Sequence, residues 1–212
     1  MKNRLVSIIF AIASILVMPA SAAFAAPLGL ATQAPTIQSS FAFIDFFEFF
    51  GDGDLSSFGA AVDSTNGVSP NGFAEIGFGI GFNLADPTTG ATGGFDVFDD
   101  DGLFLGGNLK SVGFSENVIE LEFDNLVGAG AAAFNSSVLM RIAFDDVLGP
   151  DPFSGLVDGN PYTGSLSISN VANTGTVPVP ATLALLVPAF GALVWSRKRA
   201  HHGVVIRDIQ VS

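Results

Sequence analysis

Alternating hydrophobic and polar residues recur through the middle of the chain and predict β-strands. The clearest case is 76–84, where isoleucine, phenylalanine and leucine alternate with glycine and asparagine. The same two-residue period is found in three further segments: 119–124, 138–145 and 165–169. Four other segments rich in apolar residues are also expected to be strands: 41–50, 95–98, 103–105 and 111–114. The period places apolar side chains on one face of each strand and polar ones on the other.

Glycine, proline, asparagine and aspartate separate these segments and predict turns at five places: 51–54, 66–67, 71–72, 86–90 and 149–152. About seven to nine short strands in roughly 150 residues are typical of an antiparallel β-sandwich or a jelly roll. We therefore predict a single all-β domain over 26–172. This domain holds 18 of the 21 phenylalanines, and we expect most of them to form its core because each ring buries a large apolar area.

The N-terminus has the pattern of a secretory signal peptide. Lys2 and Arg4 precede an apolar run of 13 residues, 5–17, which is short for a membrane span. Small residues follow, and Ala23-Phe24-Ala25 fits the usual cleavage pattern. We predict a signal peptide over 1–25, with a retained N-terminal anchor as the alternative.

The C-terminus carries three consecutive features after a linker that starts at 173. The first is a proline-rich motif: Val177, Pro178, Val179, Pro180 and Ala181. The second is an uncharged apolar segment, 182–196, which predicts a membrane-directed helix. The third is a basic cluster of Arg197, Lys198 and Arg199, which begins a tail over 197–212. Basic residues directly after an apolar helix hold that end in the cytoplasm.

This order of motif, helix and basic cluster resembles the PEP-CTERM sorting signal of Gram-negative bacteria. The resemblance covers about the last 35 residues and none of the β domain. It implies Sec-dependent export, transient residence in the inner membrane, processing by an exosortase-like enzyme, and delivery to the outer surface or the exopolysaccharide matrix. Val179 stands where the family has glutamate, as in a VPxPA-type variant, and the chain continues past the basic cluster to Ser212. A plain C-terminal anchor is the alternative.

The β domain is more acidic than the net charge of the whole chain indicates. The 212 residues carry a net charge of −12. Residues 26–172 contain 19 acidic side chains and only two basic ones, Lys110 and Arg141, so this domain has a charge of −17. An acidic domain has no basic footprint for nucleic acid, and we expect no nucleic-acid partner.

Several catalytic chemistries are excluded by residue type. The chain has no cysteine, and its two histidines, His201 and His202, follow the basic cluster. The β domain therefore lacks the thiolates and imidazoles of nucleophilic triads and of most zinc and haem sites. It also has no tryptophan and a single tyrosine, Tyr162, on which a sugar ring could stack. We expect no enzymatic activity, although paired carboxylates remain compatible with glycoside hydrolysis.

Acidic clusters are the remaining candidates for a bound ion. Calcium takes six to eight oxygen ligands, and loops rich in aspartate supply them. The candidate ligands are Asp96, Asp99, Asp100, Asp101, Asp52 and Asp54. Their spacing does not fit an EF-hand, and solvated turns are the alternative because aspartate and glycine favour turns.

These features favour a non-enzymatic exported protein of the cell surface or extracellular matrix. A calcium-dependent carbohydrate-binding module is one alternative and predicts exposed aromatic rings or a loop-bound ion. A secreted glycoside hydrolase is another and predicts two carboxylates in one cleft. Self-association is a further possibility if the glycine-rich strand at 75–84 lies at a sheet edge.

Overall fold

The computed structural model describes residues 27–172 of the chain. The predicted signal peptide (1–25), the linker and sorting motif (173–181), the apolar helix (182–196) and the basic tail (197–212) lie outside this part. Within 27–172, no helix has the length and apolar character needed to cross a membrane.

The described residues form nine strands and two short helical turns. The strands are β1 (Thr32–Phe49), β2 (Asp52–Ala61), β3 (Ser64–Asn66), β4 (Glu75–Asn83), β5 (Thr92–Asp99), β6 (Gly102–Ser115), β7 (Val118–Val127), β8 (Ser137–Phe144) and β9 (Pro161–Val171). The helical turns are η1 (Ala131–Ala133) and α2 (Pro152–Gly155). The all-β prediction is therefore confirmed for this part of the chain.

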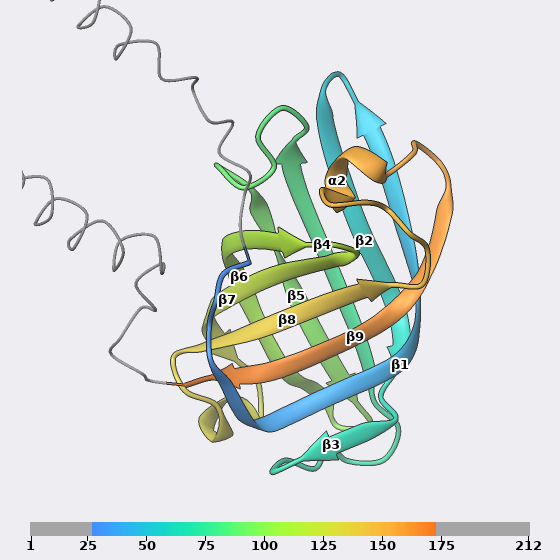
Figure 1. Ribbon diagram of the computed structural model, residues 1–212. Coiled ribbons are helices and arrows are strands. Elements are labelled where there is room, and N and C mark those ends of the chain that lie inside the picture. Colours follow the sequence, from blue (N-terminus) through green and yellow to red (C-terminus); the bar gives the residue numbers. More distant parts are fainter. Residues whose placement is uncertain (1–26, 173–212) are drawn as a thin grey trace, which may run out of the picture. The chain divides into compact units, whose positions relative to one another are not determined.

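The strands form one antiparallel sheet that closes on itself (Figure 1). Neighbouring strands follow the order β2-β4-β5-β6-β7-β8-β9-β1, and β1 also pairs with β2. The result is an eight-stranded barrel, with the short β3 added alongside β1. This corrects the expected β-sandwich or jelly roll, since no second sheet packs against the first within the described residues.

Closure depends on the length and curvature of β1. This 18-residue strand pairs with β9 from Thr32 to Asp45 and with β2 from Asp45 to Phe49. Its register against β9 shifts between Ser39 and Ala42, which marks a bulge or irregularity. Bulges bend strands and increase their twist. One strand can thereby join both ends of the sheet, and eight strands leave an interior just wide enough for side chains to fill.

The barrel interior is packed with the apolar side chains that the alternation predicted. Ile76, Phe78, Ile80 and Phe82 of β4 are all buried, while the glycines between them face outward. At one end, Phe153 of α2 lies between Phe82 and Phe114, with ring centroids 4.8 and 5.5 Å away. The turn containing α2 therefore plugs this end of the barrel.

Two local predictions need correction. The segment 51–54 is not all turn, because β2 begins at Asp52 and only Phe50 and Gly51 separate it from β1. The two expected strands at 103–105 and 111–114 are parts of one strand, β6. Strand β4 pairs with both β2 and β5 along its length, so the condition on which self-association through a sheet edge depended is not met.

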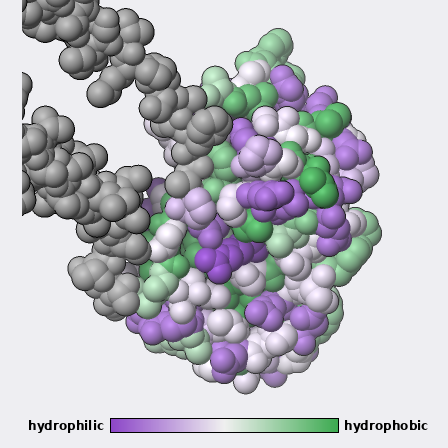
Figure 2. Space-filling model, viewed as in Figure 1, coloured by the Kyte–Doolittle hydropathy of each residue, from purple (hydrophilic) through white to green (hydrophobic). Residues whose placement is uncertain are grey.

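The expectation that phenylalanines form the core holds for ten of the 18. The other eight are exposed: Phe41, Phe43, Phe47, Phe49, Phe50, Phe58, Phe73 and Phe98. Five of them lie on β1 or in the turn that follows it. On the face crossed by β8 and β9, hydrophilic and hydrophobic residues are intermixed (Figure 2). The outer surface is thus richer in aromatic rings than the alternation implied.

The two basic residues of the barrel are used in ion pairs on the outer side of β7. Lys110 Nζ lies 2.8 Å from Glu122 Oε1, and Arg141 Nε lies 2.9 Å from Glu120 Oε1. Both glutamates are buried. Burial alone would raise the pKa of the Glu122 carboxyl, but hydrogen bonds from the side chains of Lys110, Ser111 and Ser137 leave this pKa below its ordinary value.

The variant Lys110→Met is expected to lower the free energy of unfolding at pH 7 by about 1 kcal/mol. It leaves the buried Glu122 carboxylate without its cation, and the effect is modest because the Lys110 side chain is 49% exposed. A carboxyl with a depressed pKa stabilises the fold above its unfolded-state pKa, and this contribution disappears as the pH falls through its folded-state pKa. Urea unfolding at pH 7 and pH 3 should therefore show a deficit only at pH 7.

The double variant Lys110→Met/Glu122→Gln is the control for this prediction. It removes both charges and should recover most of the lost stability at pH 7. An equal deficit at both pH values would contradict a contribution of Lys110 through its charge.

Candidate functional site

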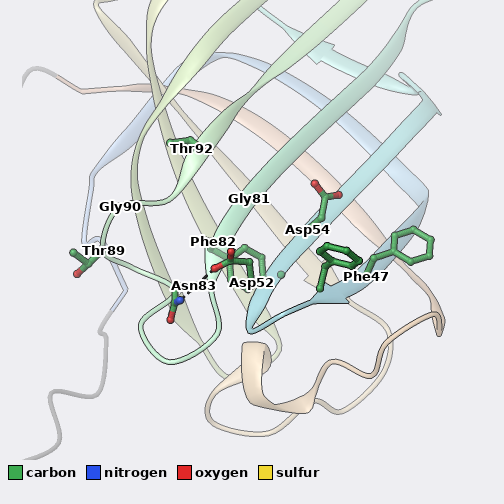
Figure 3. Close-up of a pocket in the computed structure, with 11 residues that line it drawn as sticks. Phe47, Asp52, Asp54, Gly81, Phe82, Asn83, Thr89, Gly90 and Thr92 are labelled. Atoms are coloured by element: carbon green, nitrogen blue, oxygen red, sulfur yellow. Dashed lines mark hydrogen bonds between the residues drawn. The ribbon is translucent and has the colours of Figure 1, made fainter.

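A groove of about 460 Å³ opens on the outer surface beside the hairpin that joins β1 to β2 (Figure 3). We call it the end groove. Its lining comes from β1, β2, β4 and the turn that leads into the first residue of β5: Phe47, Phe49, Asp52, Gly53, Asp54, Gly81, Phe82, Asn83, Thr89, Gly90 and Thr92. Four segments that are separate in sequence are thus brought together by strand pairing.

The strand register sets the order of side chains across the end groove. Phe47 pairs with Asp54, Asp54 pairs with Gly81, and Gly81 pairs with Thr92. This row places an aromatic ring, a carboxylate, bare backbone and a hydroxyl side by side. A Cβ atom at Gly81 would meet no heavy atom within 4 Å, so the floor of the groove is open to a ligand.

A second row lies one step closer to the hairpin. Phe49 pairs with Asp52, and Asp52 pairs with Asn83. Asn83 Nδ2 donates a hydrogen bond of 3.2 Å to Asp52 Oδ1, and Asn83 Oδ1 accepts one of 2.9 Å from the Ala85 amide. Figure 3 shows the first of these bonds. The amide of Asn83 thus restrains the Asp52 carboxylate and ties it to the turn after β4.

The end groove can offer a flat ligand two kinds of contact. Phe47 and Phe49 are largely exposed, and aromatic faces stack on apolar surfaces or attract cations. The carboxylates of Asp52 and Asp54 accept hydrogen bonds from hydroxyl or ammonium groups. Both acids are exposed and lie in the same groove.

The candidate calcium ligands are divided between the two ends of the sheet. Asp52 and Asp54 line the end groove. Asp99 is the last residue of β5, and Asp100 and Asp101 form the turn between β5 and β6. Asp96 faces outward from the middle of β5, between Gly77 and Gly106. Among residues 27–172, no three acidic or histidine side chains are grouped so that they could hold a metal ion.

The acidic turn at 99–101 is organised by Asn71. The Asn71 amide donates to Asp99 Oδ2 at 2.9 Å, and Asn71 Nδ2 donates to Asp101 Oδ2 at 2.8 Å. The Asp100 amide donates in turn to the Asn71 carbonyl at 3.1 Å. These contacts give the aspartates a role in holding the loop between β3 and β4 against the β5–β6 turn. Calcium binding by the six aspartates stays a prediction.

The phenylalanines of the end groove were missed as site residues. The signal was present in the sequence at 46–50, where four of five residues are phenylalanine. Consecutive side chains of a strand point to opposite faces. Since Phe46 faces the core, Phe47 must face outward. Adjacent aromatic residues in a strand therefore indicate that one of the rings lies on the outer surface.

Comparisons with protein-family models, with curated proteins and with solved structures find no match to this chain.

Proposed function

We propose that this protein is a non-enzymatic, exported protein of the cell surface or extracellular matrix that binds polysaccharide on the outside of its barrel. The observation that carries the proposal is the pairing of exposed phenylalanine with carboxylate in both rows of the end groove: Phe47 with Asp54, and Phe49 with Asp52. Sugar rings present apolar faces and hydroxyl donors, which match these two kinds of group.

The packing of the interior supports an external site. Buried side chains from all eight barrel strands meet in one apolar cluster, and Phe153 plugs the end next to the hairpin. In larger or emptier barrels the ligand enters the interior, whereas small barrels are filled by their own side chains. A ligand of this barrel therefore has the outer surface available to it.

The two ends of the chain support an extracellular location. The pattern at 1–25 favours export, and the features at 177–199 favour handling by an exosortase-like enzyme. The resemblance of those features to a sorting signal connects the protein with the exopolysaccharide layer. Calcium-dependent carbohydrate binding is the alternative, and chelation distinguishes the two.

Binding to the matrix polysaccharide tests the proposal. The exported protein should sediment with insoluble matrix prepared from the producing cells, and the variant Phe47→Ser should sediment about tenfold less efficiently because one stacked ring contributes roughly 1 kcal/mol or more. Phe73→Ser is the matched control, since Phe73 is 59% exposed against 55% for Phe47 but lies outside the end groove.

Three outcomes of this experiment would contradict the proposal. The first is a wild-type protein that stays in the supernatant, which removes polysaccharide binding. The second is release of reducing sugars from the matrix, which would favour the glycoside hydrolase alternative. The third is loss of sedimentation on chelation with EDTA, which would favour the calcium-dependent alternative.

Mass spectrometry of the native protein tests its export. We expect a mature N-terminus near residue 26 and a C-terminus near Pro178–Pro180 in protein recovered from the cell surface or the medium. An intact chain ending at Ser212 and recovered only with the inner membrane would instead identify a simple anchor.

A further inference from the structure

A second groove, of about 280 Å³, lies on the outer face of β4 and β5. We call it the β4–β5 groove. The chemistry-bearing residues that line it are two phenylalanines and two acids: Phe58, Phe98, Glu75 and Asp96. Its floor is bare backbone at Gly77 and Gly79. The aromatic rings, carboxylates and glycine floor of the end groove are thus repeated here.

Strand register again places an aromatic ring opposite an acid. Phe98 pairs with Glu75 across the β4–β5 ladder, and Asp96 pairs with Gly77 one step away. Phe58 reaches the groove from β2, where the register shifts between Ser57 and Ala60. Both rings are more than half exposed. Phe58 follows the alternation of Asp52 and Asp54, which places its ring on the outer face of β2.

The two grooves follow one another along the same strand. Gly77 and Gly79 line the β4–β5 groove, and Gly81 lines the end groove. Gly81 lies four positions after Gly77 on the strand, which corresponds to about 13 Å. Two sites of the same composition at this spacing fit a linear polymer better than a single small molecule.

The carboxylates of both grooves lack basic partners among residues 27–172. The two basic side chains of this part of the chain pair with Glu122 and Glu120 on the outer side of β7. Glu75 and Asp96 are exposed on the opposite part of the sheet, as are Asp52 and Asp54. Charge complementarity therefore favours a ligand that carries positive charges.

Two other occupants fit less well. An extended peptide gains affinity by adding a strand to a free edge, but β4 is hydrogen-bonded to β2 and β5 on both sides. A second copy of the barrel would bring a domain of charge −17 against another of the same charge. A sugar ring needs no free edge, because its apolar face stacks on phenylalanine.

We propose that the ligand of this surface is a polysaccharide with free amino groups, which lies along the outer face of β4 and spans both grooves. This inference rests on the proposed function and narrows its ligand to one class of sugar. The rings of Phe58 and Phe98 stack on sugar faces, and Glu75 and Asp96 accept hydrogen bonds from ammonium groups. No covalent step is involved.

The first test compares two probes of equal length, an oligomer of glucosamine and one of N-acetylglucosamine. At pH 6 and low ionic strength the exported protein should bind the glucosamine oligomer about tenfold more tightly, and added salt should remove this preference. The double variant Glu75→Gln/Asp96→Asn should lose the preference. Glu116→Gln, an exposed acid in the β6–β7 turn outside both grooves, should retain it.

The second test fills the β4–β5 groove without disturbing the barrel. A Cβ atom at Gly79 would meet no heavy atom within 4 Å, and a β-branched residue suits a strand. Gly79→Thr should therefore unfold at the same or a higher temperature than the wild type, yet bind the glucosamine oligomer about tenfold less tightly. Ser167→Thr, on the outer face of β9, introduces the same residue elsewhere and should change neither property.

The outcomes separate this inference from the proposed function. Equal affinity for both oligomers, or undiminished binding by a folded Gly79→Thr variant, would overturn the inference even if the protein still sediments with the matrix. Tighter binding of a lysine-rich peptide than of the glucosamine oligomer would also overturn it. Absence of sedimentation with the matrix would instead remove the proposed function itself.

Discussion

Replacing Phe153 by alanine is expected to lower the free energy of unfolding by about 3–5 kcal/mol, which is the usual cost of removing a buried phenylalanine. Phe153 is only 3% exposed and is the ring through which α2 enters the barrel. It packs edge-on against Phe82 and Phe114 from two different strands. The substitution leaves a cavity among rings that belong to a closed sheet. The closed sheet limits how far these rings can move to fill the cavity.

Chemical denaturation measures this effect directly, because the midpoint falls while the slope is unchanged if the barrel stays intact. The matched control is Phe50→Ala. Phe50 is 94% exposed, and its removal should change the free energy of unfolding by less than about 0.5 kcal/mol. A loss below about 1 kcal/mol for Phe153→Ala would mean that α2 does not plug the barrel.

Replacing Gly93 by alanine is the second change with a large expected effect, at least about 3 kcal/mol of unfolding free energy. Gly93 has a φ of +149° at the start of β5, a conformation that side chains rarely adopt. A Cβ atom there would collide with the carbonyl oxygen of Gly79 and approach the Cα of Ile80. Both atoms belong to the backbone of β4, so the strand pair would have to separate.

Gly81→Ala is the matched control for this prediction. Gly81 lies on the neighbouring strand with ordinary φ and open space where its Cβ would be. Alanine is favoured over glycine within a strand, so this variant should be stabilised by about 0.5 kcal/mol. Thermal unfolding of the two variants side by side should give midpoints displaced in opposite directions. Similar midpoints would show that the close approach of β5 to β4 at Gly93 is not required for the stability of the barrel.

The strands were predictable because their apolar residues alternate, whereas the closure of the sheet was not. Ile76 to Phe82 would alternate in the same way in a sandwich and in a barrel, since both bury one face of each strand. The difference lies in β1, whose two halves pair with β9 and β2, more than 100 residues apart in sequence. Nothing local in β1 specifies such long-range pairing.

Strand β2 was not predicted from the sequence because its first residues are typical of a turn. Asp52, Gly53 and Asp54 have strong turn propensity, but in the structure they pair with β1 on one side and β4 on the other. Position 53 of the strand requires glycine for a steric reason, because a side chain there would overlap the rings of Phe46 and Phe82. Tertiary packing thus overrides local propensity at this position.

The candidate site was partly visible in the sequence. Asp52, Asp54 and Asp96 were singled out as acids, and they do line grooves of the outer surface. Their neighbours were not predicted, because Phe47 and Phe98 were assigned to the core on the general preference of phenylalanine for burial. Only the pairing of strands shows that each acid lies beside an aromatic ring or bare backbone.

Hydroxyl-radical labelling of the protein, read by mass spectrometry with and without matrix polysaccharide, tests the central claim most directly. Exposed aromatic rings are labelled, and rings covered by a ligand are protected. We expect several-fold protection of Phe47 and Phe49 when polysaccharide is bound, with Phe41 and Phe73 labelled as before. Unchanged labelling of Phe47 and Phe49 in a sample that sediments with the matrix would contradict it.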